Sequence, residues 1–166
     1  SVNMGIECAD EEYRRTVLNR PMSNDTIRAA CDRLHRRGIA ILSDNMLGLP
    51  GRGFEDDVET LRFNVACGVD YPLAMLFQPY PGTEIERYCR ERGLFDGDYD
   101  RLDYNYYFRS PLRFTSAEEK RKIENLHKLF AVTAEIPRAL PFVRRLVRLP
   151  HNDIFNSIFR SWYAFC

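Results

Sequence analysis

Three apolar, strand-like runs in the first half of the chain each end in a short turn motif and then give way to a helical pattern. The turn motifs are Gly5-Ile6-Glu7, Gly48-Leu49-Pro50-Gly51 and Tyr80-Pro81-Gly82-Thr83. Strands that alternate with helices in this way build a parallel sheet, because parallel neighbours need a long crossover between them. Such folds bind ligands at the carboxyl ends of their strands. The order therefore predicts an α/β protein with its site at these turns.

The periodicity divides the chain into three regions. Residues 1–93 hold three βα units, with strands predicted at 1–6, 39–46 and 71–77 and helices at 10–18, 23–37, 54–67 and 83–93. Residues 94–115 form a Tyr-rich irregular loop. Residues 116–166 form a helical tail, with a strong helix at 116–135 and an aromatic-rich helix at 153–165. Ser23, Thr83 and Ser116 are predicted N-caps, and Ser116 with Glu119 fits a capping box.

The composition excludes several classes of protein. The 166 residues carry no formal net charge, so the chain has no general attraction for nucleic acid. No apolar stretch is long enough to span a bilayer, and we expect no signal peptide. The five cysteines are scattered, which favours reduced thiols in a cytosolic protein over a disulfide framework. They and the three histidines form no ligand spacing, so we expect no metal bound by this chain.

Polar side chains at the strand ends are candidate ligand contacts. The carboxylate of Glu7 could accept hydrogen bonds from ribose hydroxyls or an amino group, and Arg20 could bind a carboxylate bidentately. The alternatives are a surface glutamate that begins a helix and a solvated loop arginine. Gln78 and Tyr80 end the third strand beside a turn. We expect Glu7, Asn45 and Gln78 to lie along one rim and to face a common cavity.

Gly48-Leu49-Pro50-Gly51 is the most specific local motif. Glycines after a buried strand allow the backbone to approach a flat ligand closely. The motif is not a phosphate loop, because Arg52, Gly53 and Phe54 do not supply the lysine and hydroxyl that such a loop needs. The alternative is a plain strand-to-helix turn, which an isolated Gly-Pro-Gly favours.

In this order the motifs resemble the second half of the radical S-adenosylmethionine (SAM) enzymes. The segment from Asn3 to Cys8 looks like the family's Gly-Ile-Glu-Ser strand, and Leu18-Asn19-Arg20 resembles the arginine segment that follows it. Asp44 to Gly51 is similar to the Gly-Leu-Pro-Gly-Glu-Thr strand end, and Gln78 to Thr83 looks like the next Tyr-Pro-Gly-Thr element. The resemblance covers residues 1 to 93 and implies the second half of a partial (β/α) barrel. In the tail, residues 104–111 resemble the cobalamin-binding subgroup.

The resemblance implies a SAM site. Glu7 would contact the ribose or amino group, Arg20 the carboxylate, and the backbone around Met46 to Pro50 the adenine. The implied cofactor contacts are Glu7, Arg20, Asn45, Met46, Gly48, Leu49, Pro50, Gln78 and Tyr80. No catalytic residue is assigned. Two departures stand out: Arg52-Gly53 replaces Glu-Thr, so the following helix loses a hydroxyl cap, and Cys8-Ala9 replaces Ser-Gly.

The family's cluster motif is absent from this sequence. Radical SAM enzymes hold a 4Fe-4S cluster on a Cys-x-x-x-Cys-x-x-Cys loop, and thiolates must converge on such a cluster. Because the chain also opens inside a strand-like run, we expect a carboxy-terminal fragment that is inactive alone. The missing N-terminal part would bind the cluster, and cobalamin if it is used. The intact parent would be a cytoplasmic enzyme that modifies a small organic substrate by radical chemistry.

A second hypothesis is a non-catalytic α/β scaffold whose tail docks on a membrane surface or partner. Between residues 109 and 149, ten lysines and arginines oppose four acids, and Arg144, Arg145 and Arg148 alternate with apolar residues. Interfacial helices have such a composition, which would make the protein membrane-associated. The alternative is that these faces pack under the barrel. A third hypothesis is a degenerate paralogue that binds SAM without a cluster.

Overall fold

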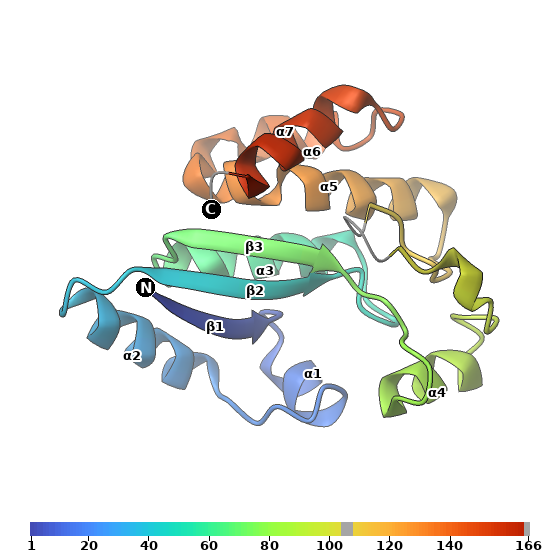
Figure 1. The fold of residues 1–166 in the computed structure, drawn as a ribbon, viewed down its shortest axis with the longest axis horizontal. Coiled ribbons are helices and arrows are strands. Elements are labelled where there is room, and N and C mark those ends of the chain that lie inside the picture. Colours follow the sequence, from blue (N-terminus) through green and yellow to red (C-terminus); the bar gives the residue numbers. More distant parts are fainter. Residues whose placement is uncertain (104–107, 165–166) are drawn as a thin grey trace.

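The centre of the protein is a three-stranded parallel sheet in the order β1-β2-β3. The computed structural model describes residues 1–103 and 108–164. Strands β1 (Val2–Glu7), β2 (Ile41–Leu47) and β3 (Tyr71–Leu76) all point the same way, so their carboxyl ends meet at one edge (Figure 1). Across the sheet Gly5 pairs with Asp44, which pairs with Leu73, and nearer the carboxyl edge Met46 pairs with Met75.

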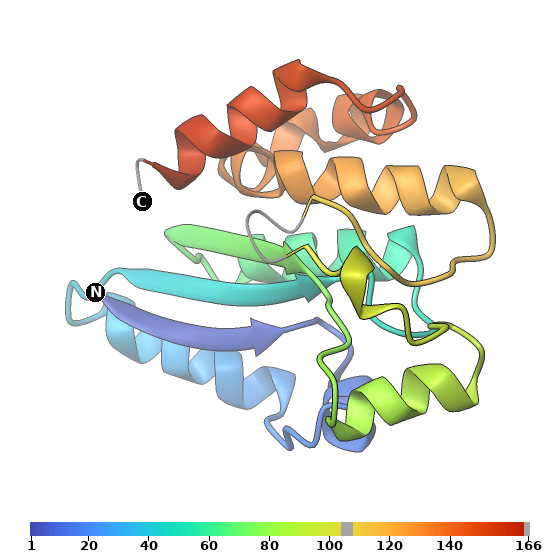
Figure 2. The same cartoon turned by 45° about the vertical axis from the view of Figure 1, so that its right-hand side comes forward.

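Helices cover one face of this sheet. Helix α2 (Asn24–His35) lies in the β1–β2 connection, and α3 (Phe54–Ala66), in the β2–β3 connection, packs behind the sheet in Figure 1. The short helices α1 (Glu11–Thr16) and α4 (Glu84–Glu91) lie beyond the carboxyl edge. The long helix α5 (Ala117–Glu135) packs against β3 and α3. In Figure 2, α6 (Leu140–Leu146) and α7 (Asp153–Tyr163) stack on its far side. Two short 3-10 turns complete the described elements: η1 (Tyr99–Arg101) and η2 (Pro137–Ala139).

The opposite face of the sheet carries no helix in the part of the chain that the structure describes (Figure 1). Strand β2 shows the resulting alternation, because Ser43 and Asn45 are fully buried toward α3 while Asp44 and Met46 between and after them stay partly exposed. The register places further side chains beside these two on the same side. We call this side the open face; it carries Gly5, Leu42, Asp44, Met46, Leu73 and Met75.

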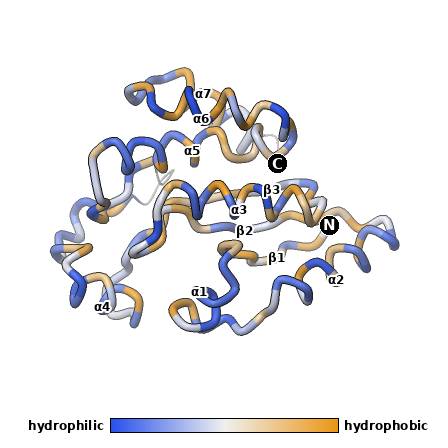
Figure 3. Tube along the Cα trace, turned by 180° about the vertical axis from the view of Figure 1, so that it is seen from behind, coloured by the Kyte–Doolittle hydropathy of each residue, from blue (hydrophilic) through white to orange (hydrophobic). Residues whose placement is uncertain are grey.

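The main core lies between the sheet, α3 and α5. Leu47, Leu76, Val58, Ile123 and Phe130 are at most 1% exposed there. In Figure 3, hydrophobic segments of the strands and of α3 lie next to one another, while much of α2 consists of hydrophilic residues. Burial of this apolar surface is the main stabilising contribution to the fold.

The predicted α/β class, parallel sheet and helical tail are confirmed, and the element bounds agree within a few residues. Ser23, Thr83 and Ser116 are N-caps, each accepting a hydrogen bond from the backbone N–H three residues later, at 3.0 to 3.2 Å. Three strands do not decide whether the sheet belongs to a barrel, so the barrel stays a prediction. Within the described residues of the predicted loop, η1 is the helical turn that forms.

The predicted capping box is only half formed. Ser116 caps α5, but Glu119 does not return to the Ser116 backbone. Instead Glu119 Oε1 accepts a hydrogen bond from the Phe54 N–H at the start of α3, at 2.7 Å. Gly53 offers no hydroxyl to that helix end, as the sequence indicated, and an orphan N–H at a helix start needs an acceptor. A carboxylate from α5 supplies it.

The helical tail packs on the core with one side of its helices. Leu140, Val143, Val147 and Phe155 are buried against α5, which confirms for these residues the alternative that the tail packs on the body of the protein. Arg144 forms a bidentate ion pair with Glu55 of α3, at 2.8 and 2.6 Å. Among the described residues, no helix is both long and apolar enough to cross a bilayer.

Candidate functional site

The pair Glu7–Arg20 covers the open face at the end of β1. Arg20 Nη1 lies 2.5 Å from Glu7 Oε1. A Cβ added to Gly5 would stand 2.7 Å from Glu7 Oε1 and 3.1 Å from Arg20 Nη2. Position 5 therefore accepts only glycine while the pair keeps this place. Burial raises the pKa of Glu7, Arg20 opposes this shift, and Asp44 adds to it.

Arg20 is held over β1 by the segment that joins α1 to α2. Its backbone N–H donates to the carbonyl of Arg14, at 2.9 Å. Arg14 is itself fully buried and its guanidinium donates to the carbonyls of Cys8 and Met22 and to Asn24 Oδ1. A buried guanidinium needs acceptors of this kind, and both of its terminal nitrogens have them. It fastens the end of β1, α1 and the start of α2 together, and so positions the Glu7–Arg20 pair.

Asp44 is a site residue that the sequence analysis missed as an individual contact. It lies on the open face in the middle strand, opposite Gly5 in the register, and close enough to Glu7 to raise that group's pKa. The signal was present in the alternation of β2, where Leu42, Asp44 and Met46 take every second position and therefore share a face. Glu7, Arg20 and Asp44 form the polar end of the site.

An apolar groove adjoins this polar end at the carboxyl edge of β2 and β3. It has a volume of about 320 Å³. Met46 and Met75 lie side by side in its floor, and Tyr80 and Ile85 line the side toward α4. Flexible thioethers and an aromatic ring suit a flat, partly apolar ligand. The predicted contacts Met46, Gln78 and Tyr80 are thus brought together here.

Gln78 also holds the Tyr-rich loop in place. Its amide Nε2 donates to the carbonyl of Arg109 at 3.0 Å, and its Oε1 accepts from the N–H of Asp103 at 3.2 Å. One side chain at the end of β3 therefore fastens both flanks of residues 104–107, which lie outside the described residues.

The prediction that Asn45 shares the cavity with Glu7 and Gln78 is wrong. Its side chain is fully buried and points toward α3, where Nδ2 donates to the Leu73 carbonyl at 2.8 Å and Oδ1 accepts from Asn64 Nδ2 at 2.7 Å. The pleat of β2 sends residue 45 to the face opposite Asp44. Asn45 is a structural residue of the β2–α3 contact.

The Gly-Leu-Pro-Gly motif is held from inside the protein. Gly48 has φ +64°, and its N–H donates to both carboxyl oxygens of Asp57, at 3.1 Å each. Tyr13 donates its hydroxyl to the Pro50 carbonyl at 2.9 Å, and Leu49 is 2% exposed. Burial raises the pKa of Asp57 well above its usual range. These contacts account for Gly48 as a turn residue, and Gly48, Leu49 and Pro50 are all buried.

The described cysteines offer no cluster site. Cys8, Cys31, Cys67 and Cys89 are buried. Burial raises the pKa of Cys8 to about 11 and of Cys67 and Cys89 to about 12, so they are thiols near neutral pH. In the described part of the chain no three His, Cys, Asp or Glu residues converge in a metal-binding arrangement. These residues do not fit a 4Fe-4S cluster.

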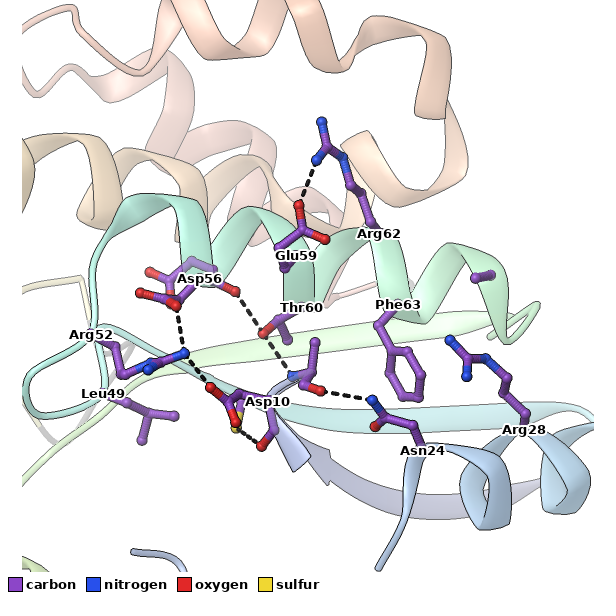
Figure 4. A pocket seen from close by; sticks show the side chains of 14 residues that line it. Asp10, Asn24, Arg28, Leu49, Arg52, Asp56, Glu59, Thr60, Arg62 and Phe63 are labelled. Atoms are coloured by element: carbon purple, nitrogen blue, oxygen red, sulfur yellow. Dashed lines mark hydrogen bonds and ion pairs between the residues drawn. The ribbon is translucent and has the colours of Figure 1, made fainter. Parts of the chain in front are cut away.

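A larger cavity, of about 450 Å³, lies on the helical side of the sheet between α2 and α3 (Figure 4). Most of its charges are paired within the cavity, since Arg52 pairs with Asp10 and Asp56, and Arg62 pairs with Glu59. Of the predicted contacts, only Leu49 and none of the polar ones line it. The open face, which gathers Glu7, Arg20, Met46, Gln78 and Tyr80, is therefore the candidate site.

Comparisons with known proteins match parts of the chain. No family model matches it. Over 48 residues it is 44% identical to the tRNA-2-methylthio-N(6)-dimethylallyladenosine synthase of Alkalilimnicola ehrlichii; this stretch is 29% of the chain and 11% of that synthase. The coproporphyrinogen III oxidase HemN of Escherichia coli, described as a radical SAM enzyme, aligns with 84% of the chain and 26% of its own, at 18% identity and a TM-score of 0.49. The chain is thus similar over part of its length to two enzymes, and neither similarity concerns a cobalamin-binding subgroup.

Proposed function

We propose that this chain provides the SAM-binding half of a radical SAM enzyme. The observation that carries the proposal is the combination, on one open sheet face, of the Glu7–Arg20 pair with an apolar groove lined by Met46 and Met75. The order of the motifs from Gly5-Ile6-Glu7 to Tyr80-Pro81-Gly82-Thr83 supports it, as does the sequence match to a synthase.

The chemistry of the open face suits each part of SAM. Glu7 and Asp44 are acceptors for an amino group and for ribose hydroxyls, and Arg20 is a donor for a carboxylate. Because Gly5 has no side chain, the carboxylate of Glu7 and the guanidinium of Arg20 can occupy the space above it. Met46 and Met75 offer an apolar surface for adenine, next to the Gly48 backbone. Bound SAM would supply the reactive methyl or adenosyl group, and this chain's residues would orient it.

The proposal assigns no iron–sulfur cluster to the described residues, because their cysteines do not fit one. We propose that another part of the same polypeptide binds the cluster, and that this chain alone is inactive. The cobalamin-binding subgroup rests on residues 104–111 of the sequence, of which 104–107 lie outside the described residues, and it stays a prediction. The small organic substrate and the cytoplasmic location likewise stay predictions.

Binding of SAM to the 166-residue chain tests the proposal by isothermal titration calorimetry. We expect saturable binding that Arg20→Met weakens by about tenfold or more, because a charge-assisted hydrogen bond to a carboxylate is lost. Glu7→Gln should weaken binding in the same direction. The matched control is the exposed Glu12–Arg15 pair of α1, at 2.6 Å; Glu12→Gln and Arg15→Met should leave the affinity unchanged.

The same titration separates the rival hypotheses. A folded chain that binds no SAM would favour the non-catalytic scaffold. Equal losses in the site and control variants would show that the open face is not the site. A degenerate paralogue would bind SAM like the proposed fragment, and a Cys-x-x-x-Cys-x-x-Cys motif in adjoining coding sequence would decide against it.

A further inference from the structure

A stripe of alternating arginine and apolar side chains runs along the outward side of α6 and its flanking turns. Its members are Arg138, Phe142, Arg145 and Leu149. Phe142 and Arg145 are three residues apart in α6 and share a helical face, while Arg138 lies in η2 before the helix and Leu149 in the turn after it; all four are exposed. The residues on the opposite face, Leu140, Val143 and Val147, are buried in the core. We call these four outward residues the arginine–apolar stripe.

The stripe exposes large apolar groups. Phe142 is 63% exposed and Leu149 47% exposed, and Ile136 beside them is 56% exposed. Single exposed apolar residues are ordinary on protein surfaces, but residues 136–149 expose three of them. Pairing with the body of the protein does not explain them, because the core side of the same helix is already filled.

The charge of the stripe is one-sided. Residues 136–152 contain four arginines and no aspartate or glutamate, with Glu135 before them and Asp153 after them. Arg144, on the side of the helix, pairs with Glu55. Arg138, Arg145 and Arg148 form no ion pair with any residue that the structure describes. The patch therefore keeps an uncompensated positive charge.

We propose that the arginine–apolar stripe docks this chain on an anionic membrane surface. The guanidinium groups of Arg138 and Arg145 would bind lipid phosphates, while Phe142 and Leu149 would enter the boundary between headgroups and acyl chains. Nucleic acid would engage the arginines but would leave the aliphatic side chain of Leu149 exposed to water. An uncharged protein groove would leave the arginines without counter-ions. A bilayer with anionic lipids offers phosphates to the two arginines and an apolar boundary to Phe142 and Leu149.

Binding through so short a helix must be reversible and dependent on salt. The proposal does not depend on the SAM site, which lies at the carboxyl edge of the sheet. Co-sedimentation with vesicles tests it on the 166-residue chain. We expect binding to vesicles of phosphatidylglycerol and phosphatidylcholine at low salt, and release at high salt. Vesicles of phosphatidylcholine alone should bind little.

Variants identify the surface. Arg138→Gln and Arg145→Gln should each lower the partition coefficient about fivefold, and Phe142→Ser should lower it about tenfold. Because these side chains are exposed, circular dichroism should show an unchanged fold. The control is Arg36→Gln, which removes one positive charge from an exposed position at the end of α2. The proposal is overturned if the parent chain does not sediment above the phosphatidylcholine background, or if the control loses as much binding as the stripe variants.

Discussion

At the scale of single residues, two glycines of this chain serve different ends. Gly5 has ordinary backbone angles, and the absence of its side chain leaves room for the carboxylate of Glu7 and the guanidinium of Arg20. Gly38 ends α2 with φ +66° and has open space around it. One glycine thus protects a site, and the other allows a left-handed turn that L-residues rarely adopt.

Replacing each glycine by alanine should separate these roles. Gly5→Ala should lower SAM affinity by about tenfold or more with little change in the free energy of unfolding, because only the Glu7–Arg20 pair must move. Gly38→Ala should lower the free energy of unfolding by about 1 kcal/mol and leave SAM affinity unchanged. Urea unfolding and calorimetric titration of both variants check this. Equal effects of both variants on both measurements would contradict the assignment.

At the scale of elements, helix α3 is capped by another helix. Sequence reasoning correctly found that Gly53 leaves the start of α3 without a hydroxyl, but a carboxylate 65 residues further along fills the gap. The local pattern Ser116-to-Glu119 predicts a capping box within α5. That prediction fails for Glu119 because its carboxylate accepts a hydrogen bond from the Phe54 N–H, which has no partner within α3, instead of from the Ser116 N–H.

Glu119→Ala should destabilise the fold by about 1–2 kcal/mol, the usual loss for an N-cap acceptor. The amides at the start of α3 should also exchange with solvent faster. Hydrogen exchange and urea unfolding measure the two effects. Glu118→Ala is the control, since Glu118 is exposed in the same turn of α5 and should change stability by no more than about 0.5 kcal/mol. A control that loses as much as Glu119→Ala would mean that α5, not α3, was affected.

At the scale of the whole molecule, the tail is joined to the body through a buried layer that includes titratable groups. His127 of α5 is 1% exposed and packs against the rings of Phe108 and Phe159, which also contact each other. Burial lowers the pKa of His127 to about 3. Burial and the neighbouring Arg109 and Lys128 lower the pKa of His151 to about 4, although Glu124 lies 3.0 Å away. Both histidines are neutral at physiological pH.

The protein should therefore lose stability in mild acid. Between pH 6.5 and about 3 the unfolded chain binds a proton at His127 that the folded chain does not. The free energy of unfolding then falls by up to about 1.4 kcal/mol for each pH unit below 6.5, from this residue alone. His127→Phe, which cannot bind a proton, should reduce that slope. Urea unfolding at pH 7, 6 and 5 measures it, and an unchanged slope in His127→Phe would show that His127 is not the titrating group.

The candidate site was predictable to the level of its strand ends. The motifs located Glu7, Arg20, Gln78 and Tyr80 at one sheet edge, because parallel strands must bring their carboxyl ends together. The sheet face to which each side chain points was harder to predict from the sequence. Asn45 and Asp44 are neighbours in sequence, and a one-residue difference in the pleat sends one into the β2–α3 contact and the other onto the open face.

The sequence by itself determined the order of strands and helices, the parallel sheet and the helix starts at Ser23, Thr83 and Ser116. These features depend on local periodicity and on hydrogen bonds within a few residues, which can be read along the chain. Only the tertiary structure decided that Arg14 is buried beneath the site, that Glu119 caps α3 and that α6 turns Phe142 outward. Each of these depends on contacts between segments far apart in sequence, whose partners no local pattern specifies.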